Sequence, residues 1–202
     1  MEKINKILIG THNLGKFREI SSLLPKRLVK LSPANLNISE PKETGKSFKE
    51  NSILKAKYFY KKTGIPTISD DSGLEVNCLN NKPGIHSARW AKKQGGFYKA
   101  MQKIIKEVTK KNKVIRKKNW NARFICSLTF INNKGNAIST NGIIKGTIAK
   151  KIKGTNGFGY DSIFVPLNKK LTFGEMKKKN KMKIDHRYIA YQNLKKKLKF
   201  FK

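Results

Sequence analysis

The chain has 202 residues and a formal net charge of +34, from 46 Lys and Arg against 12 Asp and Glu. This length suits one domain with a substantial core, so we expect a single domain over residues 1–202. The two cysteines, Cys78 and Cys126, lack CxxC spacing, which excludes a disulfide framework and a zinc site. Neither a membrane-spanning apolar stretch nor a signal-peptide core is present, so we expect a cytoplasmic protein.

The basic residues are mostly lysines, scattered singly or in short runs. A genome biased toward A and T would produce this pattern, although such a field also attracts polyanions. We therefore expect neither a membrane partner nor specific nucleic-acid binding. Carboxylates are scarce, so the adjacent pair Asp70-Asp71 stands out from the background. A cluster of acids in so basic a chain predicts a bound divalent cation, Mg²⁺ being the usual one.

The first quarter of the chain predicts a buried strand followed by a helix. Ile7-Leu8-Ile9 is a short apolar run that ends at Gly10. Between Gly15 and Leu24 the apolar side chains share one helical face, and Pro25 ends the helix. A weaker strand is expected over Leu28–Leu31, and residues 32–46 read mostly as loop.

The next segment predicts a capped helix and two short strands. Ser47 and Glu50 match a capping box that opens a helix to about Thr63. Thr67–Ser69 is expected to be a strand that delivers Asp70-Asp71-Ser72-Gly73 to its exit loop. Leu74–Leu79 is expected to be a separate strand.

The second half predicts a turn, two helices and a hairpin. We expect a turn at Pro83-Gly84, a helix within Gly96–Lys111, and a hairpin of Phe124–Ile131 and Ala137–Ile144 around Asn132–Gly135. A glycine-rich loop, a strand and a last helix follow at Gly154–Asp161, Ile163–Val165 and Asp185 to about Phe201. The elements lack a strict βαβ rhythm, so the fold class is α/β with a mixed sheet flanked by helices.

A phosphate-binding loop is predicted where the first strand meets the first helix. Gly10-Thr11-His12-Asn13-Leu14-Gly15-Lys16 offers backbone N–H groups at a helix N-terminus and a lysine. The spacing mimics a Walker A motif, but Phe17 stands where that motif needs a hydroxyl ligand for Mg²⁺. A solvated turn would also explain this segment by itself.

The carboxylates are the candidates for metal binding and for activating water. Adjacent side chains on a strand point in different directions, so Asp70 and Asp71 should have different roles. Glu43, in a loop, is a second candidate. Glu50 is either a ligand or simply the acid of its capping box. Lys55 lies beyond Glu50 on the same helix and is either a site lysine or a surface one.

Two segments near the C-terminus predict a nucleobase pocket. In the glycine-rich loop, Phe158 and Tyr160 could stack on a base, although one of them is expected to insert into the core. Asp185 is a good N-cap that places His186 and Arg187 on the first turn of the last helix. Arginine and lysine, including Lys181, are suited to the acceptor edge of a 6-oxo purine.

In order along the chain, these segments resemble the Ham1-like inosine/xanthosine triphosphate pyrophosphatase family. The resemblance covers nearly the whole chain. The matching residues are Thr11-His12-Asn13-Leu14-Gly15-Lys16, Glu43-Thr44-Gly45, Glu50-Asn51, Lys55-Ala56, Asp70-Asp71-Ser72-Gly73-Leu74, Pro83-Gly84, Ser87-Ala88-Arg89, Gly157-Phe158-Gly159-Tyr160-Asp161, Lys181 and His186-Arg187.

The resemblance implies an elongated mixed α/β fold with two lobes around a central cleft, usually a homodimer. It implies cleavage of ITP, dITP and XTP to the monophosphate and pyrophosphate. Asp71 would be the catalytic base, and Glu43 and Asp71 would hold Mg²⁺, supported by Glu50 and Asp70. The residues that would bind the substrate are Thr11, His12, Asn13, Leu14, Gly15, Lys16, Lys55, Ser72, Phe158, Gly159, Tyr160, Asp161, Lys181, His186 and Arg187.

One residue departs from the family pattern. Asp185 stands where members commonly have Ser before the His-Arg pair, and its charge could retune base recognition. Three other functions fit parts of the sequence. A basic nucleic-acid-binding protein explains the charge, a P-loop kinase or GTPase explains the Walker-like spacing, and a Maf-like pyrophosphatase would act on other modified nucleotides.

Overall fold

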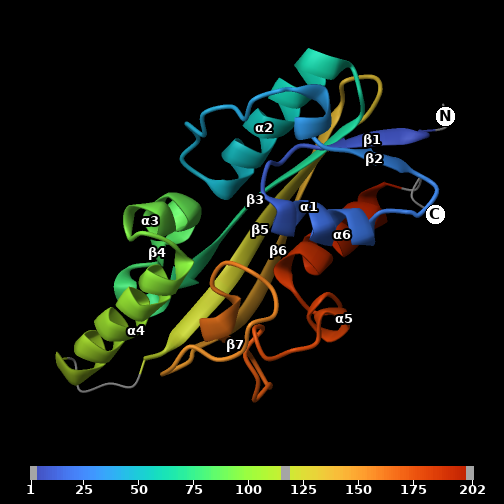
Figure 1. Ribbon diagram of the computed structural model, residues 1–202. Helices are drawn as coiled ribbons and strands as arrows, with labels where there is room; N and C mark the ends of the chain where they lie inside the picture. The colour runs from blue at the N-terminus through green and yellow to red at the C-terminus, as the bar shows by residue number, and fades with distance from the viewer. Residues whose placement is uncertain (1–3, 115–118, 199–202) are drawn as a thin grey trace. The chain divides into compact units, whose positions relative to one another are not determined.

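The computed structural model describes residues 4–114 and 119–198. In this part of the chain seven strands form one sheet in the order β2-β1-β3-β5-β6-β7, with β4 paired to β3 (Figure 1). β1 pairs in parallel with β2 and β3, whereas the β3–β4 and β6–β7 pairs are antiparallel. The predicted mixed α/β class is therefore confirmed. The strands are Lys6–Ile9, Val29–Leu31, Thr67–Val76, Lys82–Pro83, Asn121–Ile131, Ala137–Ile148 and Phe164–Pro166 for β1 to β7.

Six α-helices accompany these strands in the described residues. Four of them match the predicted helices, but α3 and α5 were not expected. No helix in the described part of the chain is long and apolar enough to cross a membrane. The helices are Leu14–Leu23, Phe48–Thr63, Ser87–Lys93, Phe97–Val114, Lys178–Lys181 and His186–Lys197 for α1 to α6.

The chain divides into two compact units. Unit 1 comprises residues 1–71, 126–142 and 186–202, and unit 2 comprises residues 72–125 and 143–185. Each unit has its own cluster of buried apolar side chains. Because β3, β5 and β6 contribute residues to both units, the sheet belongs to both. We keep the single-domain organisation over residues 1–202 as a prediction.

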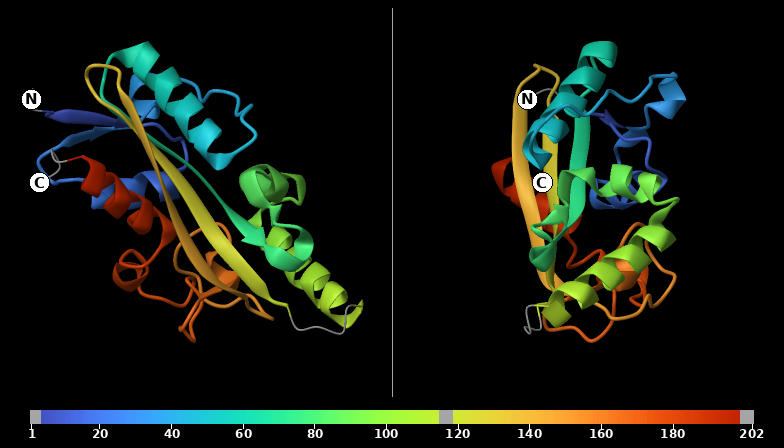
Figure 2. Two further views of the ribbon diagram at one scale, coloured as in Figure 1. Left: turned by 180° about the vertical axis from the view of Figure 1, so that it is seen from behind. Right: turned by 90° about the vertical axis from the view of Figure 1, so that its left-hand side faces the viewer.

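Unit 1 is a helix–sheet–helix sandwich. Helix α2 lies on one face of its strands, and α1 and α6 lie on the other (Figures 1 and 2). Ile7 and Ile9 of β1 join the cluster with Ile20 of α1 and Leu194 of α6. Gly10 is at the opposite face, where an added Cβ would come within 2.6 Å of a ring atom of Phe59 on α2. The packing of α2 against β1 therefore requires glycine at position 10, whether or not a ligand binds there.

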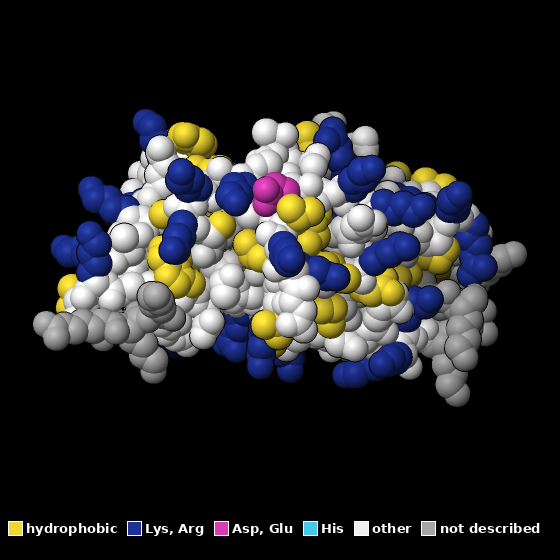
Figure 3. Space-filling model, turned by 90° about the horizontal axis from the view of Figure 1, so that it is seen from below, with side chains coloured by type: hydrophobic (Ala, Val, Ile, Leu, Met, Phe, Trp, Pro, Cys, Tyr) yellow, Lys and Arg dark blue, Asp and Glu magenta, His cyan; other side chains and the backbone are white. Residues whose placement is uncertain are grey.

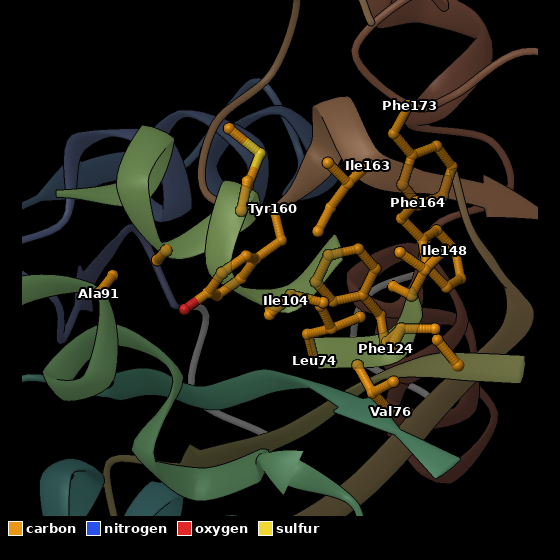
Figure 4. Packing of buried hydrophobic residues seen from close by; sticks show 14 of the residues in the cluster. Leu74, Val76, Ala91, Ile104, Phe124, Ile148, Tyr160, Ile163, Phe164 and Phe173 are labelled. Atoms are coloured by element: carbon orange, nitrogen blue, oxygen red, sulfur yellow. The ribbon is translucent and has the colours of Figure 1, made fainter. Parts of the chain in front are cut away.

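The core of unit 2 is rich in aromatic rings. Phe124, Phe164 and Phe173 pack against one another at centroid distances of 4.7 to 6.2 Å. The ring of Tyr160 lies in the same cluster, and its hydroxyl donates to the Ser87 carbonyl at 2.9 Å (Figure 4). Such contacts between aromatic rings add to the energy of apolar burial. Tyr160 is therefore the aromatic residue of the glycine-rich loop that inserts into the core, as predicted for one of the pair.

Two predictions about β3 were wrong. The Asp pair was expected in an exit loop and Leu74–Leu79 in a separate strand, but β3 runs unbroken from Thr67 to Val76. Residues Asn77–Leu79 form a 3-10 turn instead. Pairing with β1 at its beginning and with β4 at its end supports the full length of the strand. β1 and β5, the neighbours of β3 in the sheet, are distant in sequence and leave no local signal.

Other boundaries agree closely with the sequence. The hairpin forms around Asn132–Gly135, where Gly135 has a φ of 79° that favours glycine. The last helix ends at Lys197, before the expected end near Phe201, a residue outside the described part of the chain.

Candidate functional site

The site in unit 1 is organised by the alternation of side chains along β3. Ile68 lies in the cluster with α1 and α6, so Asp70, two residues on, faces the same helices. Asp71 faces α2. Both aspartates are buried, at 0% and 4% exposure. The expectation that the neighbouring carboxylates point in different directions is confirmed, for the simple reason that they are in a strand.

Asp71 faces two polar residues of α2. Its Oδ2 accepts a hydrogen bond from the Asn51 side-chain amide at 3.1 Å. Lys55, one helical turn beyond Asn51, is 1% exposed and donates from Nζ to Glu43 Oε1 at 2.7 Å. This one-turn stretch of α2 therefore gathers Glu43 from the preceding loop and Asp71 from β3 around one lysine. Lys55 is therefore not a surface lysine, and its role in a site stays a prediction.

The charges in this cluster shift the pKa values of its members. Burial raises the pKa of Asp71, Lys16 and Lys55 lower it, and Glu43 raises it, so that the pKa lies above its ordinary value. Burial by itself would lower the pKa of Lys55, but Asp70, Asp71 and Glu43 together raise it. The charged form of Lys55 is accordingly favoured, and Asp71 is a carboxylate that holds its proton more readily than an exposed aspartate does.

Glu50 has the local role that its position predicts. Ser47 is the N-cap of α2, and its side chain accepts from the Glu50 backbone N–H at 3.1 Å. The Glu50 carboxylate accepts from the Lys46 backbone N–H at 2.8 Å and from the Ser47 hydroxyl at 3.1 Å. These hydrogen bonds lower the pKa of Glu50. The capping function is thus fulfilled, and a supporting role at a metal ion stays a prediction.

Asp70 belongs to a chain of buried charges between β3, α1 and α6. Its Oδ2 is 3.3 Å from Lys16 Nζ and accepts from Arg187 Nε at 3.2 Å. Arg187 also donates from a terminal nitrogen to Glu19 Oε2 at 2.9 Å. Arg187 and Glu19 are 3% and 5% exposed. Sequence reasoning missed Glu19, because its partner Arg187 is 168 residues away in the chain.

The predicted phosphate loop connects β1 to α1 as expected. Asn13 is the N-cap of α1, and its side chain accepts from the Lys16 backbone N–H at 3.0 Å. Thr11 is buried, and its hydroxyl oxygen accepts from the Asn13 N–H at 3.2 Å. His12 lies 3.9 Å from Glu40, and Leu14 is 69% exposed. The loop therefore presents the N-terminus of α1 next to Lys16, which adjoins Asp70.

A second predicted cluster forms in unit 2. Lys181 donates from Nζ to Asp161 Oδ2 at 2.6 Å, and both residues are buried. The same carboxylate oxygen accepts from the Phe158 backbone N–H at 2.9 Å. The Lys181 ammonium lies 5.1 Å from the Phe158 ring centroid, a cation–π distance. Phe158 is half-buried, so this ion pair holds an accessible aromatic ring in place.

The remaining predicted residues divide between the units. In unit 2, Gly159 precedes Tyr160 with a φ of 68°, a conformation that favours glycine, and Ser72 follows Asp71 in β3. Asp185 is buried at 1% exposure, so the residue that departs from the family pattern is not on the surface. In unit 1, His186 is buried at 3% exposure at the beginning of α6.

A separate cavity of about 310 Å³ lies in unit 2, and none of the predicted site residues lines it. Its walls are Lys169, Lys170, Leu171, Met176, Asn180 and Ile184.

The donor chemistry of the Asp71 cluster fits a hard cation. Mg²⁺ prefers carboxylate oxygens and needs only one or two of them, because it keeps several waters and binds substrate phosphates. Glu43 and Asp71 satisfy this requirement. Among the described residues, no three His, Cys, Asp or Glu side chains are grouped closely enough to hold a metal ion together. Binding of the ion by Glu43 and Asp71 stays a prediction.

The chain is similar to known proteins over nearly its whole length. The model of the Ham1 family matches residues 7–197, so the chain belongs to the Ham1 family. The dITP/XTP pyrophosphatase of Christiangramia forsetii is 38% identical over 94% of this chain and 96% of its own length. That of Dictyoglomus thermophilum is 41% identical over 94% and 92%.

Solved structures give the same family. A HAM1 protein from Coxiella burnetii matches with a TM-score of 0.85 and 30% identity, over 97% of this chain and 99% of that one. The Staphylococcus aureus Ham1 protein matches with a TM-score of 0.78 and 32% identity, over 98% and 100%. The resemblance found in the sequence is thereby confirmed, and the P-loop and Maf-like alternatives are set aside.

Proposed function

We propose that this chain hydrolyses non-canonical purine nucleoside triphosphates, namely ITP, dITP and XTP, to the monophosphate and pyrophosphate. The observation that carries the proposal is the buried cluster of Asp71, Glu43, Lys55 and Asn51 on one face of β3. The curated relatives that match this chain over nearly its full length are dITP/XTP pyrophosphatases. Membership of the family and the cluster together support a pyrophosphatase rather than a protein that only binds nucleic acid.

In the proposed reaction a water molecule attacks the α-phosphorus and the α–β phosphoanhydride bond breaks, with pyrophosphate as the leaving group. Asp71 accepts the proton of the attacking water. Bound Mg²⁺, held by Glu43 and Asp71, would neutralise phosphate charge and orient the triphosphate. Lys55 and Lys16 supply fixed positive charge for the phosphates, and the N–H groups at the beginning of α1 supply hydrogen bonds. Ser72 is a further proposed phosphate contact.

We assign base recognition to Phe158 and Lys181, with Gly159, Tyr160 and Asp161 shaping the loop. Phe158 offers a ring for stacking, and Lys181 offers a donor to the 6-oxo acceptor edge. Asp161 holds Lys181 in place. By family resemblance His186 and Arg187 also contact the base, and a homodimer in the cytoplasm is the expected state of the enzyme.

Product analysis tests the proposed reaction directly. Purified protein with Mg²⁺ should convert ITP to IMP and pyrophosphate in equal amounts, and ATP much more slowly. Ion-exchange chromatography of the nucleotides, together with a pyrophosphate-specific assay, distinguishes cleavage at the α–β bond from cleavage at the β–γ bond. Release of IDP and orthophosphate would contradict the proposal, because it means cleavage at the β–γ bond.

Replacing Phe158 by Ala should weaken binding of the base without impairing the chemistry. Loss of one stacking contact, about 1–3 kcal/mol, corresponds to a KM for ITP raised by about 5- to 150-fold with little change in kcat. Steady-state kinetics measure both constants. Phe158→Tyr, which keeps the stacking face, is the matched control and should stay near the parent. An equal fall of kcat in both variants would contradict stacking on this ring.

Metal binding should be visible in the titration of Asp71. Because the folded state raises the pKa of Asp71, the metal-free protein loses stability as pH rises from the unfolded pKa through the folded one. Mg²⁺ should restore that stability and release protons. Thermal denaturation across this pH range, with EDTA or with Mg²⁺, measures the effect. In Asp71→Asn the Mg²⁺-dependent part should vanish; if it persists, the ion is held elsewhere.

A further inference from the structure

The polar face of helix α4 has an ordered arrangement of lysines. Lys99, Lys103, Lys106, Lys110 and Lys113 follow one another at intervals of four, three, four and three residues. This spacing places all five on one side of a helix. The row, which we term the lysine stripe, is about 21 Å long at 1.5 Å per residue.

The opposite side of α4 is buried in the core of unit 2. Ala100, Met101, Ile104 and Val108 are buried, at 0 to 7% exposure. They pack in the aromatic cluster of unit 2. Helices that bind membranes in the interfacial plane need an accessible apolar face to insert between lipids. Because α4 has none to offer, the stripe fits a polyanion in solution better than a lipid surface.

Acidic side chains of unit 2 offset little of this charge. Glu75 pairs with Arg123, Asp161 with Lys181, and Glu175 accepts from the Thr172 backbone N–H. Asp185 is buried. Glu107 is the described acid that adjoins the stripe, 4.0 Å from Lys103. The acidic side chains are thus buried inside the unit or engaged in local pairs, whereas the lysines of the stripe remain on the surface. The composition alone does not reveal this difference. Figure 3 shows one face of the whole protein, on which Lys and Arg side chains are abundant and Asp and Glu side chains are few.

Aromatic side chains accompany the stripe. Trp90 of α3, which packs against α4, lies under the Lys103 ammonium, 5.9 Å from its ring centroid. Tyr98, in the first turn of α4, is 63% exposed. A basic row that follows phosphates, next to an exposed ring on which a base stacks, is the general arrangement of sites for unpaired nucleic acid.

We propose that the lysine stripe, with Tyr98, binds single-stranded nucleic acid independently of its sequence. The stripe would contact successive phosphates, and Tyr98 would stack on one base. This binding is separate from the pyrophosphatase reaction and does not rest on it. It is also compatible with the absence of sequence-specific recognition, because phosphate contacts carry no sequence information.

The test compares two variants with the same loss of charge. The stripe variant replaces Lys99, Lys106, Lys110 and Lys113 by Gln. The control variant replaces Lys57, Lys61, Lys62 and Lys134 by Gln, which are exposed lysines of unit 1 outside any such row. Fluorescence anisotropy measures binding of a labelled oligothymidylate of about twelve nucleotides over a range of KCl concentrations. Both variants should keep the parental rate of ITP hydrolysis, so the two proposals fail independently.

The stripe variant should bind about tenfold more weakly or worse at about 50 mM KCl, and its salt dependence should be shallower by about three in the log–log slope, or about 0.7 per lost phosphate contact. The control should change severalfold less. Tyr98→Ala should weaken binding to the single strand and leave a duplex of equal length unaffected. Equal losses in both lysine variants would show attraction by net charge alone and overturn the proposal. Tighter binding to phosphatidylserine vesicles than to the oligonucleotide would overturn it as well.

Discussion

Asp71→Asn should lower kcat for ITP hydrolysis by at least about 10²-fold, and by as much as about 10⁴-fold, while the protein stays folded. The carboxylate is the proposed proton acceptor, and an amide cannot take the proton of the attacking water. The fold should survive, because the Asn side chain can still hydrogen-bond Asn51 and no longer has to be buried as a charge. Initial rates at saturating ITP and Mg²⁺, with circular dichroism of the same sample, measure both effects.

Asp70→Asn is the matched control, since the same chemical change is made one residue away. Asp70 faces α1 and α6 and is engaged by Lys16 and Arg187. Its loss should therefore reduce stability more and kcat less than the loss of Asp71. Near-normal turnover in Asp71→Asn would refute the assignment of the base. Equal losses of kcat in the two variants would mean that the orientation of the two side chains does not separate their roles.

Arg187→Ala should lower the free energy of unfolding by about 3–5 kcal/mol. The guanidinium joins Glu19 of α1 to Asp70 of β3, and all three side chains are buried. Removing it takes this cation away from two buried carboxylates, whose burial as charges is costly. Urea denaturation monitored by tryptophan fluorescence and by circular dichroism measures the change.

An exposed ion pair provides the control for Arg187. Arg123 donates to Glu75 at 2.7 Å, with its side chain 43% exposed, so Arg123→Ala should cost only about 0–1 kcal/mol. The double variant Glu19→Gln/Arg187→Met, which removes charge at both ends, should recover part of the stability lost in Arg187→Ala. The buried-charge account fails if Arg187→Ala is as stable as Arg123→Ala.

Base selectivity separates a structural role of Arg187 from direct recognition. Arg187→Lys keeps a positive charge, but a single ammonium cannot match both the Nε contact to Asp70 and the terminal-nitrogen contact to Glu19. Purely structural anchoring predicts lower stability with an unchanged ratio of ITP to ATP turnover. The contact implied by the family resemblance predicts that the ratio falls.

The sequence by itself determined the features that depend on neighbouring residues. Ser47 and Glu50 predicted the beginning of α2, because the hydrogen bonds of a capping box form within four consecutive residues. The turn residues Asn132–Gly135 predicted the hairpin, because the conformation of a turn depends on the backbone dihedral angles of its own residues. The motifs likewise identified the Ham1 family, because the residue types of each motif and the order of the motifs can be read from the sequence alone.

Only the tertiary structure decided which side chains meet. β3 continues through Asp70 and Asp71 as a strand of the sheet, between β1 and β5, and this continuity sends the two carboxylates to opposite faces of the sheet. Arg187 meets Asp70 across 117 residues of sequence, and no local pattern encodes such a contact. Glu19 was overlooked for the same reason. Local hydrogen bonds fix a cap or a turn, whereas the packing of helices on a sheet assembles a site from residues that are distant in the chain.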